Sequence, residues 1–290
     1  KISMRQITKE LIQKYDIRMT KSLGQNFLVD DNVIEKIVKM ADIDEKDIVI
    51  EVGPGIGNMT RKLAAKAGRL IAVEIDKHLI PPLEEVLKDF PNSLLINKDI
   101  LKLSLEEVIR EEKEKAPSIE KVKVVANLPY YITTPIIMKF LEENPGIDSM
   151  VFMIQKEVAE RIVASPGGKD YGALSVAVQY YSKPERLFDV SPNCFVPKPE
   201  VDSTVIRMNI FKEPAVTLIN RDMFFATVKA SFGQRRKTLL NALSNSNKFG
   251  RSKEEIRQIL IGLGIDENAR GETLTINQFA QISNEFAKEQ

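Results

Sequence analysis

The chain has 290 residues, of which 43% are hydrophobic and 29% charged, as expected for a soluble globular protein of one or two domains. No apolar run reaches the roughly 18 residues of a membrane span, and the polar, basic residues 1–21 predict no secretory signal. A single cysteine, Cys194, and a single histidine, His78, disfavour a disulfide and a zinc site, so we expect a cytoplasmic protein without metal.

The net charge of +1 hides an uneven distribution of charge along the chain. Residues 1–29 contain six basic and two acidic side chains, a net charge of +4. Residues 223–252 contain no acid and six basic side chains: Lys229, Arg235, Arg236, Lys237, Lys248 and Arg251. Two separate basic segments indicate a polyanionic partner, although a solvated charged face would look the same.

The apolar pattern predicts a helix over 3–15, and a second helix that Asp30 or Asp31 caps, with Val33, Ile34 and Val38 at helical spacing. Strands and helices then alternate. The predicted strands are 47–52, 69–75, 93–98, 121–126 and 149–154, and the predicted helices are 57–67, 78–89, 105–114, 135–143 and 156–164. This alternation predicts a Rossmann-like α/β fold with a parallel sheet and right-handed crossovers.

The pattern changes in the last third of the chain. A further helix is predicted over 171–181 and a last strand over 201–211, after which residues 221–290 have only helical periodicity. We therefore expect two domains: an α/β domain over 1–212 and a small all-helical domain over 213–290, which carries the acid-free basic segment.

A glycine-rich turn, Gly53-Pro54-Gly55-Ile56-Gly57, follows the first predicted strand and precedes a helix. Such a turn lets backbone amides approach a ligand closely, although it is also a common connector. Its G-x-G-x-G spacing differs from the G-x-G-x-x-G fingerprint of dinucleotide sites, which argues against NAD.

Polar side chains end the next three strands. Glu74, 21 residues after Gly53, can accept hydrogen bonds from both ribose hydroxyls, and Asp99 can accept one from an adenine amine. Asn127 ends the fourth strand. Acids at strand ends are often only caps, but in this order they indicate an adenosine-containing cofactor.

Asn127 opens the tetrapeptide Asn127-Leu128-Pro129-Tyr130, whose side chains differ from those of an ordinary loop. The amide of Asn127 can accept from an amine, Pro129 makes the backbone rigid, and Tyr130 offers a flat face. A simple turn is the alternative. We interpret the tetrapeptide as a slot for a nucleobase amine, with Phe195 as the candidate for the second face unless it is a core residue.

The order of these features is that of S-adenosylmethionine-dependent methyltransferases acting on exocyclic amines, and six motifs make the resemblance more specific. They are residues 21–28, 52–55, 127–132, 155–158, 171–175 and 195–203. Together they resemble the ribosomal RNA adenine dimethyltransferases over residues 21–278, nearly the whole chain. The resemblance implies S-adenosylmethionine contacts at Asn26, Leu28, Gly53, Gly55, Glu74, Asp99 and Asn127.

The closest resemblance is to the bacterial small-subunit branch, the kasugamycin-sensitivity type. It implies N6,N6-dimethylation of two adjacent adenosines near the 3′ end of 16S RNA, on a precursor of the small ribosomal subunit. We expect Asn127 and the Leu128 carbonyl to hold the amine, without a metal or a strong base, and the six basic residues to contact RNA phosphates. We expect a monomer.

Three other functions remain open from the sequence. The large-subunit enzymes of macrolide resistance are similar but usually carry Asn-Ile-Pro-Tyr and lack the Tyr171–Ser175 stretch. A non-catalytic factor that binds immature particles belongs to a different class. An NAD-dependent dehydrogenase has the wrong glycine spacing here, and no obvious acid–base residue is present.

Overall fold

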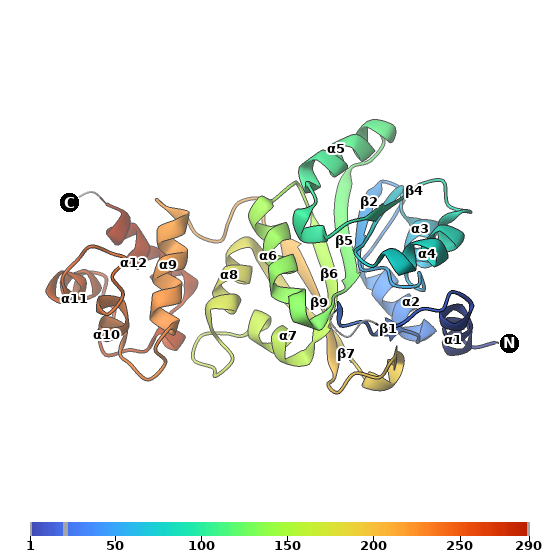
Figure 1. The fold of residues 1–290 in the computed structure, drawn as a ribbon. Coiled ribbons are helices and arrows are strands. Elements are labelled where there is room, and N and C mark those ends of the chain that lie inside the picture. Colours follow the sequence, from blue (N-terminus) through green and yellow to red (C-terminus); the bar gives the residue numbers. More distant parts are fainter. Residues whose placement is uncertain (1, 20–22, 289–290) are drawn as a thin grey trace. The chain divides into compact units, whose positions relative to one another are not determined.

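The structure is a computed structural model that describes residues 2–19 and 23–288 (Figure 1). The first two residues of the predicted N-terminal motif, Lys21 and Ser22, lie outside the described part of the chain. Contacts divide the chain into two compact units. The first unit contains residues 1–159 and 185–210, and the second contains residues 160–184 and 211–290. The predicted boundary at 212 differs, because it leaves residues 160–184 with the α/β part.

The first unit contains the seven-stranded sheet, in the order β4-β3-β2-β5-β6-β9-β7, except for the first three residues of β7. The strands are β2 (Asp47–Val52), β3 (Arg69–Glu74), β4 (Ser93–Asn97), β5 (Lys121–Asn127), β6 (Ser149–Gln155), β7 (Ser182–Val190) and β9 (Ser203–Ile210). The pairs β4–β3, β3–β2, β2–β5 and β5–β6 are parallel, as predicted, whereas β9 runs antiparallel to β6. The Rossmann-like fold class is therefore confirmed.

Strand β7 was not predicted, because its sequence is mostly polar and contains Pro184. Proline removes a backbone donor and is tolerated at a sheet edge, which is where β7 lies. A further pair of two-residue strands, β1 (Phe27–Leu28) and β8 (Phe195–Val196), forms a separate antiparallel sheet. These strands are too short to show the alternation of apolar and polar residues from which a strand is predicted.

The helices that precede or connect these strands are α1 (Met4–Lys14), α2 (Asp31–Met40), α3 (Thr60–Lys66), α4 (Ile80–Leu87), α5 (Leu105–Lys115), α6 (Thr133–Glu143) and α7 (Lys156–Val163). Asp30 caps α2, as predicted, by accepting a hydrogen bond from the Val33 amide at 3.0 Å. Helix α3 begins three residues later than predicted, because Gly57 has φ +89° and cannot belong to a right-handed helix.

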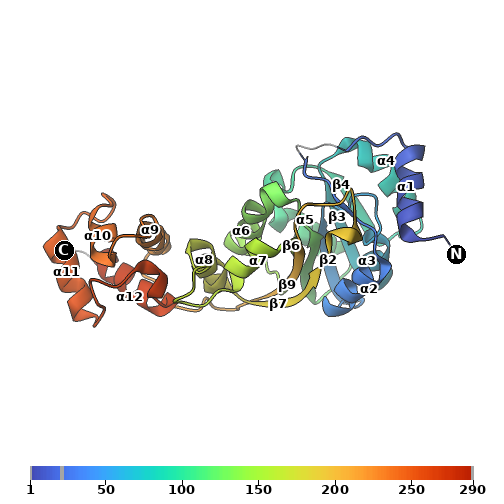
Figure 2. The same ribbon diagram turned by 90° about the horizontal axis from the view of Figure 1, so that it is seen from below.

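Helices cover both faces of the sheet. Figure 2 shows α2 and α3 on one side of the strands and α6 on the other. On the α2 and α3 side, Ile34 and Leu63 pack in one cluster with Val49, Val125 and Val151 of three adjacent strands. These side chains are almost completely buried. The β-branched strands predicted from the sequence thus form the core that holds the carboxyl ends of β2, β3 and β5 in place.

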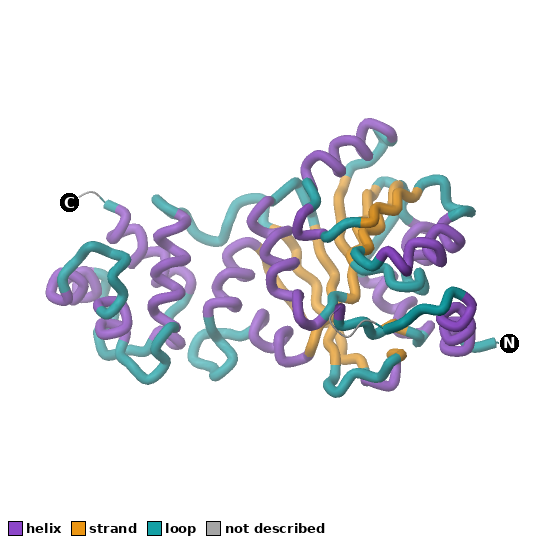
Figure 3. Tube along the Cα trace, in the orientation of Figure 1, coloured by secondary structure: helices purple, strands orange, loops and turns teal. Residues whose placement is uncertain are grey.

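The second unit contains α8 (Ala173–Tyr181), α9 (Arg221–Phe232), α10 (Leu239–Ser244), α11 (Lys253–Gly262) and α12 (Ile276–Ala287). Figure 3 shows that the chain from α9 onwards contains helices and loops only, as predicted. Tyr171 packs edge-on against Phe232 and donates a 2.7 Å hydrogen bond to the Leu274 carbonyl. The Tyr171–Ser175 motif therefore stabilises this helical unit. None of the described helices is long and apolar enough to cross a membrane.

Candidate functional site

A cavity open to solvent lies in the first unit at the carboxyl ends of β2, β3 and β5. Open α/β sheets bind their ligands at this edge. The predicted cofactor residues all line it: Asn26, Leu28, Gly53, Gly55, Glu74, Asp99 and Asn127. The structure thus brings together residues that are up to 101 positions apart in the sequence.

The glycine-rich turn exposes its backbone to this cavity. Gly53 and Gly55 have φ values of +67° and +64°, which residues other than glycine rarely adopt. A Cβ atom at Gly55 would lie 2.9 Å from the Phe27 ring, which is closer than packed atoms approach. Both positions therefore favour glycine: each has a positive φ, and at Gly55 the Phe27 ring occupies the place of a Cβ atom.

Glu74 is buried and its carboxylate is aimed by two backbone amides. Its Oε1 accepts from the Gly55 amide at 3.1 Å and its Oε2 from the Asp76 amide at 3.0 Å. Burial raises the pKa of Glu74 to about 7, although these hydrogen bonds oppose the shift. Each oxygen keeps a second lone pair, so the carboxylate can still accept hydroxyl groups of a ligand.

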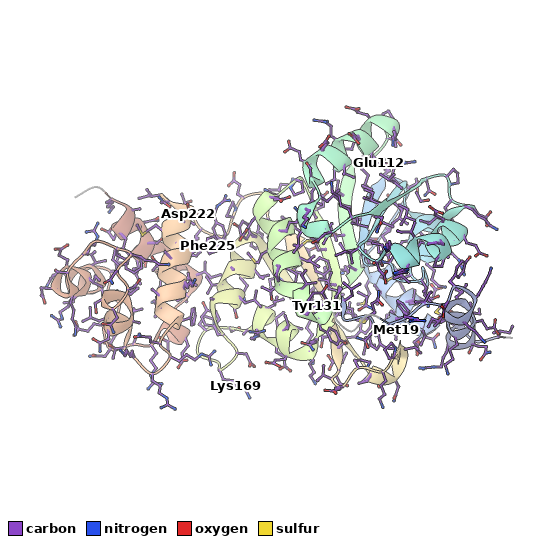
Figure 4. The ribbon with its side chains drawn as sticks, viewed as in Figure 1. Met19, Glu112, Tyr131, Lys169, Asp222 and Phe225 are labelled. Atoms are coloured by element: carbon purple, nitrogen blue, oxygen red, sulfur yellow. The ribbon has the colours of Figure 1, made fainter. Side chains whose placement is uncertain are left out.

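Asp99 follows β4 and begins a short 3-10 helix, Ile100–Lys102, by accepting from the Leu101 amide at 2.9 Å. Asp99 therefore caps this helix and also lines the cavity. Tyr131, labelled in Figure 4, also lines the cavity and is 54% exposed. Partial burial, and then the charges of Asp99 and Glu74, raise the pKa of Tyr131.

The side chain of Asn127 is oriented by the N-terminal segment. Its Nδ2 donates a 3.1 Å hydrogen bond to the Asn26 carbonyl. This contact determines which end of the side-chain amide is the nitrogen and which is the oxygen. Its Oδ1 accepts no hydrogen bond from any residue that the structure describes, although the side chain lines the cavity. A carbonyl acceptor is thus available for a ligand amine. The Leu128 amide donates to the Met153 carbonyl at 3.1 Å and fixes the next residue.

Tyr130 also lines the cavity, and its hydroxyl shares a 2.7 Å hydrogen bond with Ser203 Oγ. Burial raises the pKa of Tyr130. Phe195, in contrast, is 1% exposed, packs in the core cluster and is not among the residues that line the cavity. The structure does not bring its ring to the cavity, because β8 pairs with β1 and turns Phe195 into the core. Stacking on a base would require this side chain to be uncovered.

Sequence reasoning missed Glu51, which lines the cavity from inside β2 and is 1% exposed. Its carboxyl accepts a short hydrogen bond from Thr60 Oγ1, and burial raises the pKa of Glu51 to about 8. The signal was present, since Glu51 is the one charged residue among the apolar positions 48–52 that lead into the glycine turn.

The six basic residues predicted to contact RNA all lie in the second unit. Five are exposed: Lys229, Arg235, Arg236, Lys237 and Lys248. Arg235 Nη2 also donates a 3.1 Å hydrogen bond to the carbonyl of Lys169, which is labelled in Figure 4.

Arg251 does not match this prediction. It is half-buried, and its Nη2 donates to the carbonyls of Glu285, Phe286 and Lys288 at 3.1 to 3.4 Å, at the end of α12. A guanidinium used in this way caps a helix C-terminus, where cations are favourable. Among the described residues, no group of three His, Cys, Asp or Glu side chains could hold a metal ion.

Comparisons with known proteins point to one family. The family model of the ribosomal RNA adenine dimethylases matches residues 17–288. A protein of Alkaliphilus oremlandii named ribosomal RNA small subunit methyltransferase A is 54% identical, covering 99% of this chain and 99% of the relative. Among solved structures, a dimethyladenosine transferase of Plasmodium falciparum has 25% identity and a TM-score of 0.75, covering 87% of this chain and 94% of its own.

A second solved structure, the 23S rRNA methyltransferase ErmE, also has 25% identity, with a TM-score of 0.66 and coverage of 90% of this chain and 100% of its own. Both structures contain the same fold as this chain. The match over residues 17–288 and the 54% identity therefore show that the chain belongs to the ribosomal RNA adenine dimethylase family, a family of S-adenosylmethionine-dependent methyltransferases.

Proposed function

We propose that this enzyme dimethylates the N6 amines of two adjacent adenosines near the 3′ end of 16S RNA, on a precursor of the small ribosomal subunit. The observation that supports it most is the single cavity lining that joins Glu74 and Asp99 to the Asn127–Tyr130 tetrapeptide. The 54% identity to a small-subunit enzyme, against 25% to the large-subunit enzyme ErmE, supports this substrate over 23S RNA. We further propose that the enzyme acts as a cytoplasmic monomer.

The cavity fits the cofactor of the family. Gly53 and Gly55 line the cavity with backbone that carries no side chain, Glu74 offers a carboxylate for ribose hydroxyls, and Asp99 offers an acceptor for an adenine amine. We assign Asn26 and Leu28 to the same site, because both line it. When bound, S-adenosylmethionine supplies an electrophilic methyl group on a positively charged sulfur.

Asn127 and Leu128 act on the target amine in this proposal. The Asn127 Oδ1 and the Leu128 backbone carbonyl both accept hydrogen bonds from the amine, which draws its nitrogen toward a tetrahedral geometry. Positioning and preorganised dipoles of this kind supply much of the rate in many enzymes. A strong base is unnecessary, because the proton becomes acidic once the nitrogen carries the new methyl group and can leave to water.

The target base must leave its stack to enter the slot, which costs roughly a few kcal/mol. Stacking on Tyr130 offsets about 1–3 kcal/mol of that cost. Phe195 is the proposed second face, and this role requires its ring to move out of the core cluster in which it packs. The five exposed basic residues of the second unit are the proposed contacts to RNA phosphates.

Methylation of small-subunit particles that lack the modification tests this proposal. After reaction with the wild-type enzyme, nucleoside mass spectrometry should find N6,N6-dimethyladenosine, and primer extension should place it at two adjacent positions near the 3′ end of 16S RNA. Asn127→Ala should lower the turnover number by about 10²–10³-fold, as expected for losing a preorganised acceptor. The matched control, Asn209→Ala, changes an exposed asparagine of β9 in the same unit and should leave the rate unchanged.

The same variants separate catalysis from binding. Asn127→Ala should still bind the particles, because the proposed phosphate contacts lie in the other unit. Loss of methylation and of particle binding together would contradict this separation. Dimethyladenosine confined to 23S RNA would contradict the proposed substrate.

A further inference from the structure

Two side chains of the proposed base slot, Asn127 and Tyr130, are oriented by one short piece of chain, residues 195–203, which we name the positioning segment. It matched the family by sequence, but the cavity does not include any of its residues. One end, Ser203, contacts Tyr130, and the other end lies beside the strand that follows Asn26. Asn26 in turn holds Asn127.

The contact at the Ser203 end is a single hydrogen bond to the tip of the aromatic ring. Ser203 is completely buried, and its Oγ lies 2.7 Å from the Tyr130 hydroxyl. The neighbouring Tyr131 is 54% exposed, and its hydroxyl has no hydrogen bond to another described residue. The chain therefore anchors one of two adjacent tyrosines, and the anchored one is the tyrosine proposed to stack on the base.

The sheet fixes the position of Ser203 itself. Ser203 is the first residue of β9 and pairs with Gln155, the last residue of β6. The pairing continues one residue further, since the Lys156 amide donates to the Asp202 carbonyl at 3.0 Å. Strand β6 is also the parallel neighbour of β5, which ends at Asn127. Backbone pairing within the sheet thus fixes the position of Ser203 relative to Asn127 at the end of β5.

The other end of the segment supports Asn127 through backbone pairing. Phe195 pairs with Leu28 in the β8–β1 sheet, and the Val29 amide donates to the Cys194 carbonyl at 2.8 Å. The carbonyl that receives Asn127 Nδ2 belongs to Asn26, directly before β1. The backbone of Phe195 therefore helps to hold Asn26 in the place that orients Asn127.

We propose that the positioning segment sets the geometry of the base slot, and that Ser203 is a positioning residue that acts through Tyr130. This inference rests on the proposed function, since it concerns a base bound in that slot. A tyrosine ring can rotate about two side-chain bonds, so an anchor at its tip removes that freedom before the base arrives. Misplacing reacting groups by about 1 Å can slow an enzyme by about 100-fold, so the loss of this anchor should lower kcat.

Three variants test the role of Ser203: Ser203→Ala, Tyr130→Phe and the double variant. The kcat and KM for small-subunit particles and the Tm are measured for each. Either single variant should lower kcat by about 3- to 10-fold, the range expected for one hydrogen bond, with little change in KM. Both singles should also lower Tm, because Tyr130→Phe leaves the buried Ser203 hydroxyl without its partner and Ser203→Ala leaves the half-buried Tyr130 hydroxyl without its partner.

The double variant separates positioning from stability. It removes both hydroxyls, so its Tm should return toward the wild-type value, while its kcat should stay as low as in the single variants. The matched control is Thr204→Val, which removes a 2.8 Å hydrogen bond from the next, buried residue of β9 to the exposed Asp189. This variant should lower Tm without lowering kcat.

Recovery of both Tm and kcat in the double variant would overturn the positioning role and leave the proposed function standing. A wild-type kcat in the single variants would do the same. Absence of methyl transfer by the wild-type enzyme would overturn the proposed function, and the inference with it.

Discussion

At the scale of single residues, the cavity contains two carboxyl groups whose protonation changes near neutral pH. Burial is the largest cause for both, and it raises the pKa of Glu51 to about 8 and that of Glu74 to about 7. Glu74 accepts hydrogen bonds from two backbone amides, whereas among the described residues the Glu51 carboxyl has one donor, the Thr60 hydroxyl. The less compensated group, Glu51, is therefore the one whose ionisation destabilises the fold more.

Glu51→Gln should change how stability depends on pH. Above its ordinary pKa of 4.5, an unfolded Glu51 loses its proton, whereas the folded protein keeps it until about pH 8. The folded state therefore binds more protons, and stability falls as pH rises from about 5 to 8. Glutamine cannot ionise, so the variant should match the wild type near pH 5.

At pH 8 to 9, Glu51→Gln should be more stable than the wild type, by on the order of a few kcal/mol. Urea unfolding between pH 5 and 9 measures this difference, and the contribution of Glu74 largely cancels because both proteins contain it. A difference that does not change with pH would show that Glu51 is not a buried, protonated acid.

At the scale of elements, helix α12 ends on a guanidinium from a distant loop. Arg251 donates to three carbonyls at this end and lies 5.9 Å over the Phe286 ring, which itself stacks on Phe249. Arg251 belongs to a run of basic residues in the sequence, but it stabilises the fold of the second unit instead of adding to its exposed charge.

Arg251→Met keeps the apolar stem and removes the donors, so it should destabilise the protein by about 1–3 kcal/mol. Lys248→Met, an exposed neighbour, should leave the free energy of unfolding within about 0.5 kcal/mol of the wild type. Chemical denaturation of both variants gives the comparison. Equal stability of the two would contradict the capping role.

The elements also show how far sequence patterns reach. Strands such as 47–52 and 121–126 were predictable because β-branched residues between turn signals leave few alternatives, and Glu74 and Asp99 were predictable as polar residues at strand ends. Strand β7 was missed because edge strands tolerate polar residues and proline. Phe195 in the core, Arg251 on α12 and the Ser203–Tyr130 bond depend on partners 34 or more positions away, which no local pattern contains.

At the scale of the whole molecule, the cavity and the proposed contacts to RNA phosphates lie in different units. The first unit contains the cavity, and the second contains the five exposed basic residues. Because the net charge is only +1, the proposed binding of RNA depends on this local concentration of charge and not on the charge of the whole protein.

Replacing Arg236 and Lys237 together with alanine should weaken binding to small-subunit particles and make it less sensitive to salt. Each lost phosphate contact lowers the slope of log affinity against log salt by about 0.7–0.9, so the double variant should lose about 1.5. A matched pair on α5, Arg110→Ala with Lys113→Ala, is exposed on the first unit and should leave the slope unchanged. Equal slopes in all three proteins would contradict the assignment.

The most direct test of the proposed substrate is a competition in one reaction. Unmodified small and large ribosomal subunits are mixed in equal amounts with the wild-type enzyme and methyl-labelled S-adenosylmethionine, and the label in each purified RNA is counted over time. The account predicts that label enters 16S RNA and approaches four methyl groups per molecule, two on each adenosine, while 23S RNA stays unlabelled. Label that accumulates in 23S RNA instead would contradict it.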